Sequence, residues 1–392
     1  MSSLESWAYL SRVVEGPSRP LQALLNAGRD ADEIAHGVRT RASWLGDLHS
    51  QTESRYAWDR ASEDLAQAAT IGARLISPES LEWPAAELDQ AFGFAATGRS
   101  DHLRSYQADA VAPHALWVRG ENVKVAVAQS VAIVGTRALT RYGMEATKRL
   151  VSGLAAHQWT VVSGGALGID TVAHEAALDF GGITIAVAAC GLDQSYPARN
   201  AALFDRIAER GCLISEYPSG TPPQRHRFLT RNRLVAALTQ GTVIVEAAWR
   251  SGALNTLSWA EGLGRIPMAV PGPITGVGSL GCHERIKRGR AELVTGADDI
   301  RALLGAVGAL DVEEQYELAF AATPAQSLSR NELRVFDACP PEGSGTRDVA
   351  RSAGMTIPLT MHVLMELESR GMVRREGSVW RRQTNQGGRG SG

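Results

Sequence analysis

Residues 160–170 of the chain read TVVSGGALGID, and this stretch decides the expected fold. The β-branched run at 160–162 predicts a strand, the glycines predict a tight turn, and residues 171–178 have a helical pattern. Glycines let the backbone approach a ligand, and the free N–H groups of a helix N-terminus favour an anion. The stretch therefore indicates a phosphate site, although many parallel-sheet proteins need such a turn only to pack a helix on a strand.

Similar apolar runs recur between residues 125 and 300, separated by amphipathic stretches such as 146–157 and 254–263. Such runs are typical of parallel strands that helices bury on both faces. The fold class is therefore α/β, with a doubly wound Rossmann-like parallel sheet and ligands beyond the carboxyl ends of its strands. We expect strands at 131–134, 161–162, 183–188, 213–214, 243–245 and 268–270.

Composition excludes several classes of protein. A chain of 392 residues suggests two or three domains, and 40 basic against 42 acidic residues mean that any contact with nucleic acid comes from a local patch. No basic stretch followed by an apolar one begins the chain, and no central apolar run is long enough for a membrane span. We expect a cytoplasmic protein with no membrane contact, no metal and no cofactor. Its four cysteines lack paired spacing, which argues for reduced thiols at Cys190, Cys212, Cys282 and Cys339.

Seven motifs in a fixed order resemble the DprA/Smf family, the DNA-processing protein A of bacterial transformation. They are GTRALTRYG from residue 135, SGGALGIDTVAH from 163, ACGLDQSYPARN from 189, LISEYPSG from 213, HRFLTRNRLVAAL from 226, VIVEAAWRSGALNT from 243 and AVPGPI from 269. Leu167 and Leu229 depart from the commoner forms, which have arginine and proline there. The resemblance implies binding of single-stranded DNA, a homodimer and transfer of that DNA to the recombinase RecA.

Arginine and glycine gather where the expected strands end. An arginine offers five fixed donors that suit phosphate oxygens, although pairing with Asp193, Glu216 or Glu246 would explain some arginines without a ligand. Tyr196 and Phe228 are equally credible as stacking partners of a base and as loop anchors, and so is Tyr217. The expected DNA-binding residues are Gly135, Arg137, Ser163, Gly164, Gly165, Gly168, Arg199, Asn200, Arg225, Arg231, Asn232 and Arg233.

The remaining regions complete a domain plan. A helical N-terminal domain (1–120) precedes the Rossmann-like DNA-binding domain (121–304), and a linker (305–326), a winged-helix domain (327–383) and a disordered tail (384–392) follow. Helical patterns at 331–338, 346–352 and 359–370 and a hairpin at 374–381 resemble a winged helix. DNA contact by the wing and protein contact by the largely apolar third helix both remain open. The possible wing contacts are Arg374, Arg375 and Arg381.

Two other functions compete with a DNA-binding loader. The strand–glycine–helix pattern resembles lysine-decarboxylase-like enzymes that cleave the base from a nucleoside monophosphate, and Glu246 lies roughly where such an enzyme needs a carboxylate. The glycine signature of those enzymes is missing around Glu246, so we expect no catalytic residue and interpret Glu246 as structural. The second alternative is a nucleotide-sensing module whose winged helix regulates transcription.

Overall fold

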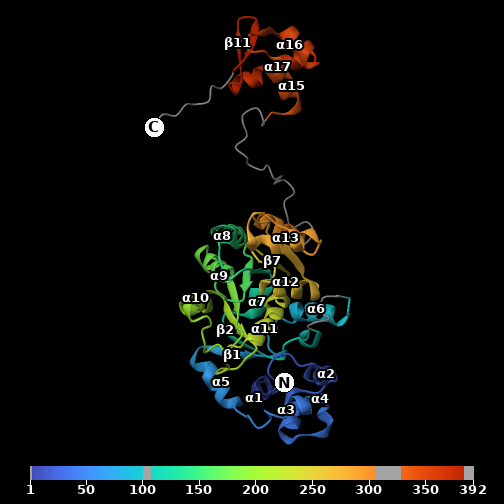
Figure 1. The fold of residues 1–392 in the computed structure, drawn as a ribbon, viewed down its shortest axis with the longest axis vertical. Coiled ribbons are helices and arrows are strands. Elements are labelled where there is room, and N and C mark those ends of the chain that lie inside the picture. Colours follow the sequence, from blue (N-terminus) through green and yellow to red (C-terminus); the bar gives the residue numbers. More distant parts are fainter. Residues whose placement is uncertain (1, 100–106, 306–327, 384–392) are drawn as a thin grey trace. The chain divides into compact units, whose positions relative to one another are not determined.

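The computed structural model describes residues 2–99, 107–305 and 328–383, and it divides the chain into two compact units (Figure 1). The first unit is Met1–Leu310 and the second is Asp311–Gly392. The expected linker and tail fall almost wholly outside the described residues.

A nine-stranded sheet organises the described residues of the first unit, in the order β1-β2-β6-β5-β4-β3-β7-β8-β9. The strands from β3 to β9 pair in parallel, while β2 is antiparallel to both β1 and β6. The large, mostly parallel sheet of the α/β prediction is confirmed. Its strands are β1 (Ala73–Ile76), β2 (Leu116–Gly120), β3 (Ser130–Val134), β4 (Thr160–Ser163), β5 (Thr184–Val187), β6 (Cys212–Ser215), β7 (Gly241–Ile244), β8 (Ile266–Ala269) and β9 (Glu292–Leu293).

Helices cover both faces of this sheet, as the apolar strands require. Successive side chains of a strand point to opposite faces of the sheet. Val131 and Ile133 of β3 therefore pack in one hydrophobic cluster with Leu150, whereas Ala132 packs in a second cluster with Leu257. One face therefore carries α8 (Arg141–Ala156) and α9 (Ile169–Asp179), and the other carries α11 (Arg225–Ala237) and α12 (Ala253–Gly262) (Figure 1). The remaining helices of this part are α7 (Val123–Val127), α10 (Ala201–Arg210), α13 (Leu280–Lys287) and α14 (Ala297–Leu304), with short turns η4 (Ala198–Asn200) and η5 (Val277–Ser279).

The first 120 residues are not purely helical, which corrects our expectation for this segment. They supply β1 and β2, and the register Trp117↔Ser215 places β2 against the edge of β6. The indole of Trp117 donates to Ser11 Oγ at 3.0 Å, which ties α1 to the sheet. The segment also forms α1 (Leu4–Val14), α2 (Arg19–Asn26), α3 (Ala31–Thr40), α4 (Asp47–Gln51), α5 (Ala61–Thr70) and α6 (Ala85–Ala96), with turns η1 (Ser43–Leu45) and η3 (Gln107–Asp109).

The second unit has three helices and a small antiparallel sheet among its described residues. The helices are α15 (Arg330–Ala338), α16 (Thr346–Ala353) and α17 (Ile357–Ser369), and the sheet has the order β10 (Ser344–Gly345), β12 (Val379–Arg382), β11 (Val373–Glu376). Gly377, at φ +65°, lies in the turn that joins β11 to β12. Trp380 is buried beneath the helices in the core of this unit.

The cysteines are free and buried at all four positions. Burial raises the pKa of the Cys190 thiol to about 11, which keeps it protonated near neutral pH. The described residues contain no group of three or more His, Cys, Asp or Glu side chains arranged to hold a metal ion. None of the described helices combines the length and the apolar character that a bilayer crossing requires.

Candidate functional site

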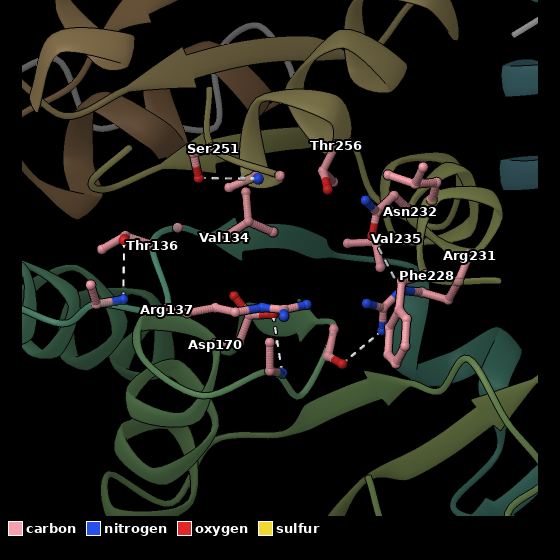
Figure 2. Close-up of a pocket in the computed structure, with 17 residues that line it drawn as sticks. Val134, Thr136, Arg137, Asp170, Phe228, Arg231, Asn232, Val235, Ser251 and Thr256 are labelled. Carbon is pink, nitrogen blue, oxygen red and sulfur yellow. Dashed lines mark hydrogen bonds between the residues drawn. The ribbon is translucent and has the colours of Figure 1, made fainter. Parts of the chain in front are cut away.

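An open pocket of about 410 Å³ lies at the carboxyl ends of β3, β4 and β7. The direction of chain order reverses here, because β3 lies between β4 and β7. Such a switch point is where open α/β sheets bind ligands. Figure 2 shows the pocket, whose lining comes from the end of β3, from the loops after β3, β4 and β7, and from the helices α9, α11 and α12: Val134, Gly135, Thr136, Arg137, Ala138, Gly164, Ala166, Asp170, Phe228, Leu229, Arg231, Asn232, Val235, Ser251, Gly252, Ala253 and Thr256.

The glycine-rich turn after β4 is held by close backbone approaches. Gly168 has φ +93°, and a Cβ there would come within 2.2 Å of the Thr136 carbonyl oxygen. The Ile169 amide donates to the same oxygen at 3.1 Å. Glycine is therefore required at residue 168 because the turn packs against the loop after β3.

The N-terminus of α9 already has an anion from the chain itself. Ala166 N–H donates to Asp170 Oδ2 at 3.4 Å. Burial raises the pKa of Asp170, although the nearby Arg231 charge opposes this shift. The expected free N–H groups are thus partly occupied, and a ligand anion must find other donors in the pocket.

Arg231 of α11 forms the back of the pocket and is only 5 % exposed. Its Nη1 donates to the Gly164 carbonyl oxygen at 2.7 Å and also to the Val187 carbonyl. Burial lowers its pKa, and the charge of Asp170 acts in the opposite direction. The guanidinium therefore fixes the glycine-rich turn and places positive charge behind it.

Arg137 supplies an accessible cation at the same pocket. It is exposed, and it forms no ion pair with any residue that the structure describes. Its charge contributes to lowering the pKa of Arg231, so the two guanidiniums share one electrostatic environment. Figure 2 shows Arg137 and Arg231 reaching toward the pocket from opposite sides.

A smaller hollow of about 130 Å³ adjoins the pocket. Arg137, Gly164, Ala166 and Phe228 line both hollows. The ring centroids of Tyr196 and Phe228 lie 5.2 Å apart with their planes tilted by 46°. These two rings therefore flank the site, whereas Tyr217 is 2 % exposed and belongs to the core.

Seven residues of the expected set do not line the pocket, yet two of them shape it. Ser163 Oγ donates to the Ile133 carbonyl at 2.6 Å, and Asn200 Nδ2 donates to the Gly165 carbonyl at 3.1 Å. Both are buried supports of the turn. Gly165 and Gly168 belong to the turn itself, and Arg199 and Arg225 are exposed away from the pocket lining; Gly135, Arg137, Gly164, Arg231 and Asn232 line it.

Arg233 does not reach the pocket, which corrects its place in the expected set. Its side chain is fully buried, and Nη2 donates to Glu216 Oε1 at 2.5 Å. Burial raises the pKa of Glu216, while the charge of Arg233 lowers it. The Arg233 guanidinium therefore forms an internal ion pair, which is the alternative to ligand binding that the sequence left open for some of the arginines.

Other lining residues were absent from the expected set, notably Asp170, Ser251 and Thr256. The sequence does indicate Ser251 and Thr256, because both residues follow the carboxyl end of the strand β7, where ligand-binding residues are expected. Asp170 could be found from its place in the first turn of α9.

The carboxylate of Glu246 lies at the start of α8 and does not line the pocket. Thr140 Oγ1 donates to its carboxylate at 3.0 Å and accepts from Gly143 N–H at the same distance. A Cβ at Gly143 or Gly278 would come within about 2.6 Å of a carboxylate oxygen of Glu246. This carboxylate is enclosed at the start of α8, consistent with its interpretation as structural.

The arginines expected on the wing are exposed in the second unit. Arg374 and Arg381 are paired across β11 and β12, and Arg381 Nε lies 3.2 Å from Glu376 Oε2. The Arg375 guanidinium lies 5.5 Å from the centre of the Trp380 ring.

The fold and the pocket together define a class: a mixed α/β protein with a large, mostly parallel sheet and a glycine- and arginine-lined pocket at its switch point. Residues 97–305 match the family model described as "DNA recombination-mediator protein A". The chain therefore belongs to this family.

Two relatives and a solved structure extend the match over most of the chain. A putative DNA processing protein DprA of Mycobacterium tuberculosis is 43 % identical over 380 residues, covering 96 % of this chain and 93 % of the relative. Protein Smf of Escherichia coli is 37 % identical over 262 residues, covering 67 % and 69 %. The X-ray structure of DprA from Streptococcus pneumoniae superposes with a TM-score of 0.63 and 29 % identity, covering 78 % of this chain and 100 % of that one.

Proposed function

We propose that the pocket binds single-stranded DNA through its phosphates, as the first step in a recombination-mediating role. The observation that carries this proposal is the pair Arg137 and Arg231, one exposed and one buried, in a glycine-lined pocket at the switch point. Their guanidiniums contact the backbone without reading sequence, and Asn232 adds a polar side chain beside them. Binding should therefore weaken steeply with salt.

The bound strand is passed to the RecA recombinase, and two copies of the chain cooperate so that one strand spans two pockets. The family description as a recombination mediator supports this order of events. DNA uptake in transformation is one setting for this activity, and other recombination is another. The protein acts in the cytoplasm, without a cofactor and without catalysis of its own.

The second unit acts as a winged helix whose β11–β12 wing approaches DNA. Exposed Arg374, Arg375 and Arg381 support this role. The competing role is protein contact through α17, where Leu359 and Met365 are exposed.

The nucleoside-monophosphate-cleaving enzyme remains the second candidate function. Enclosure of Glu246 argues against it, because the carboxylate has no access to a sugar in the pocket.

Fluorescence anisotropy tests the proposed function with the full chain, a labelled oligothymidine and a duplex of the same length. The single strand should bind more tightly, and Arg137→Ala should weaken that binding and reduce the slope of log affinity against log salt by about one. Arg141→Ala is the matched control, because that arginine is 89 % exposed on α8 and its one ion pair among the described residues is with Glu145 of the same helix. Equal affinity of Arg137→Ala and the wild type would overturn the assignment of the pocket.

Two further readouts separate the competing roles. Stimulation of RecA filament formation on oligothymidine, lost in Arg137→Ala, would support the mediator. Heat stabilisation and turnover of a nucleoside monophosphate, with no binding of either DNA, would favour the enzyme.

A further inference from the structure

The loop between β7 and α12 joins the pocket to a second hollow. Ser251 and Ala253 line the pocket, whereas Trp249 and Leu254 line a hollow of about 150 Å³ against α13. The first turn of α12 thus has one hollow on each side. Because a helix with its side chains is about 10 Å wide, the two hollows are close enough for one ligand strand to contact both.

The second hollow combines an exposed aromatic ring with cationic side chains. Trp249 is 56 % exposed, and Arg285, Arg288 and Arg290 line the hollow with it. Glu284 is the acidic residue of the lining and pairs with Arg288. Cations therefore outnumber carboxylates in the lining by three to one.

Arg285, which lines this hollow, is held in place by side chains of α12. Its Nη2 donates to Ser258 Oγ of α12 at 2.7 Å, and Nη1 lies 3.6 Å from Glu261 Oε2. Burial lowers the pKa of Arg285, with Glu261 opposing the shift. Contacts from α13 to α12 thus hold one wall of the hollow in place.

Arg250 connects the two hollows along the loop. It follows Trp249, precedes the pocket residue Ser251, and is exposed. An aromatic face with neighbouring guanidiniums suits a strand of unpaired nucleotides, because every base has a stacking face and every nucleotide a phosphate.

We propose that the Trp249 hollow is a second contact site for the same single strand, in which the indole stacks on a base and the arginines contact the adjoining backbone. This inference rests on the proposed function, since the pocket must first hold single-stranded DNA. It predicts that affinity depends on strand length, because only a strand that crosses α12 reaches Trp249.

The test compares Trp249→Ala, Trp249→Phe and the control Trp58→Ala, in the full chain. Trp58 is equally exposed, at 56 %, but lies in the N-terminal segment. Anisotropy is measured with oligothymidines of about four and about 20 nucleotides, which bracket the typical span of a single-strand-binding domain. Sedimentation of each variant reports its assembly state.

The expected result is loss of roughly fivefold or more in affinity of Trp249→Ala for the long strand, the loss typical of one stacking contact. Affinity for the short strand should not change, Trp249→Phe should recover most of the loss, and Trp58→Ala should bind like the wild type.

Three results would overturn the inference. If Trp249→Ala bound the long strand as tightly as the wild type, Trp249 would not contact the strand. If Trp249→Ala lost equal affinity for both strands, Trp249 would act through the pocket. A change in assembly state would assign the hollow to protein contact. Failure of the wild type to bind either strand would instead overturn the proposed function itself.

Discussion

Arg231 donates through Nη1 to the carbonyl oxygen of Gly164 at 2.7 Å, so a buried side chain of α11 holds the turn after β4. A Cβ on Gly164 would lie 2.6 Å from the nearest guanidinium nitrogen. The absence of a side chain at residue 164 is thus what permits this hydrogen bond. Both the charge and the shape of the pocket therefore depend on the contact between Arg231 and Gly164.

Arg231→Ala should therefore lower stability as well as DNA affinity. Two carbonyl groups lose a charged donor, which should cost about 3 kcal/mol in the free energy of unfolding of the first unit. Urea denaturation followed by circular dichroism measures the change. Exposed Arg225 of the same helix provides the control, because Arg225→Ala should shift stability by less than about 0.5 kcal/mol. Equal midpoints for the two variants would contradict this role.

Arg233→Ala should destabilise without removing a DNA contact. It leaves Glu216 as an uncompensated buried charge, which typically costs about 3–5 kcal/mol. The double variant Arg233→Met/Glu216→Leu replaces the pair by apolar side chains and should recover most of that stability. Thermal unfolding and oligothymidine anisotropy are the measurements. A folded double variant that no longer binds DNA would show that Arg233 does take part in binding.

Asp170 should make DNA binding depend on pH. Its carboxylate repels a phosphate in the pocket, and burial raises its pKa. Protonation on acidification removes that repulsion, so affinity should rise as the pH falls through this raised pKa. Asp170→Asn should bind more tightly at neutral pH and lose this part of the pH dependence. Identical pH profiles for variant and wild type would exclude Asp170 as the cause.

His174 should contribute to acid sensitivity of folding. Thr184 Oγ1 donates to the Val161 carbonyl at 2.7 Å, so it accepts from His174 Nδ1 at 2.7 Å and fixes the neutral tautomer. Burial lowers the pKa of His174 from 6.5 to about 3. The unfolded chain therefore binds the proton first, and stability present above pH 6.5 is lost progressively as the pH falls toward 3.

His174→Asn keeps an N–H donor near the same place and cannot become charged. Its urea midpoint should fall less between pH 7 and pH 4 than that of the wild type, with exposed His36→Asn as the control. Parallel pH profiles for His174→Asn and the wild type would assign the acid sensitivity to other groups.

The central sheet could be predicted because its parallel strands are short β-branched runs, such as residues 131–134, that helices bury on both faces. β1 and β2 were missed because Arg74 and Arg119 interrupt their apolar pattern. Both arginines form ion pairs, Arg74 with Glu82 and Arg119 with Asp205, so they do not prevent strand pairing.

The candidate site was predictable in its location but less so in its members. Arg231 and Arg233 are two residues apart on α11, which turns their side chains about 200° from each other around the helix axis. Helical geometry alone therefore allows only one of them to face the pocket. The identity of that one depends on the tertiary partners Gly164 and Glu216, which lie far away in sequence.

The antiparallel pairing of β2 with β6 makes the N-terminal segment inseparable from the sheet. A fragment beginning at residue 121 would leave the backbone N–H and C=O groups of β6 open along one side. Exposed strand edges of this kind recruit other chains and lead to aggregation. The first 120 residues thus serve as a permanent cover for the sheet, and insolubility of the shortened fragment would be a consequence of its geometry.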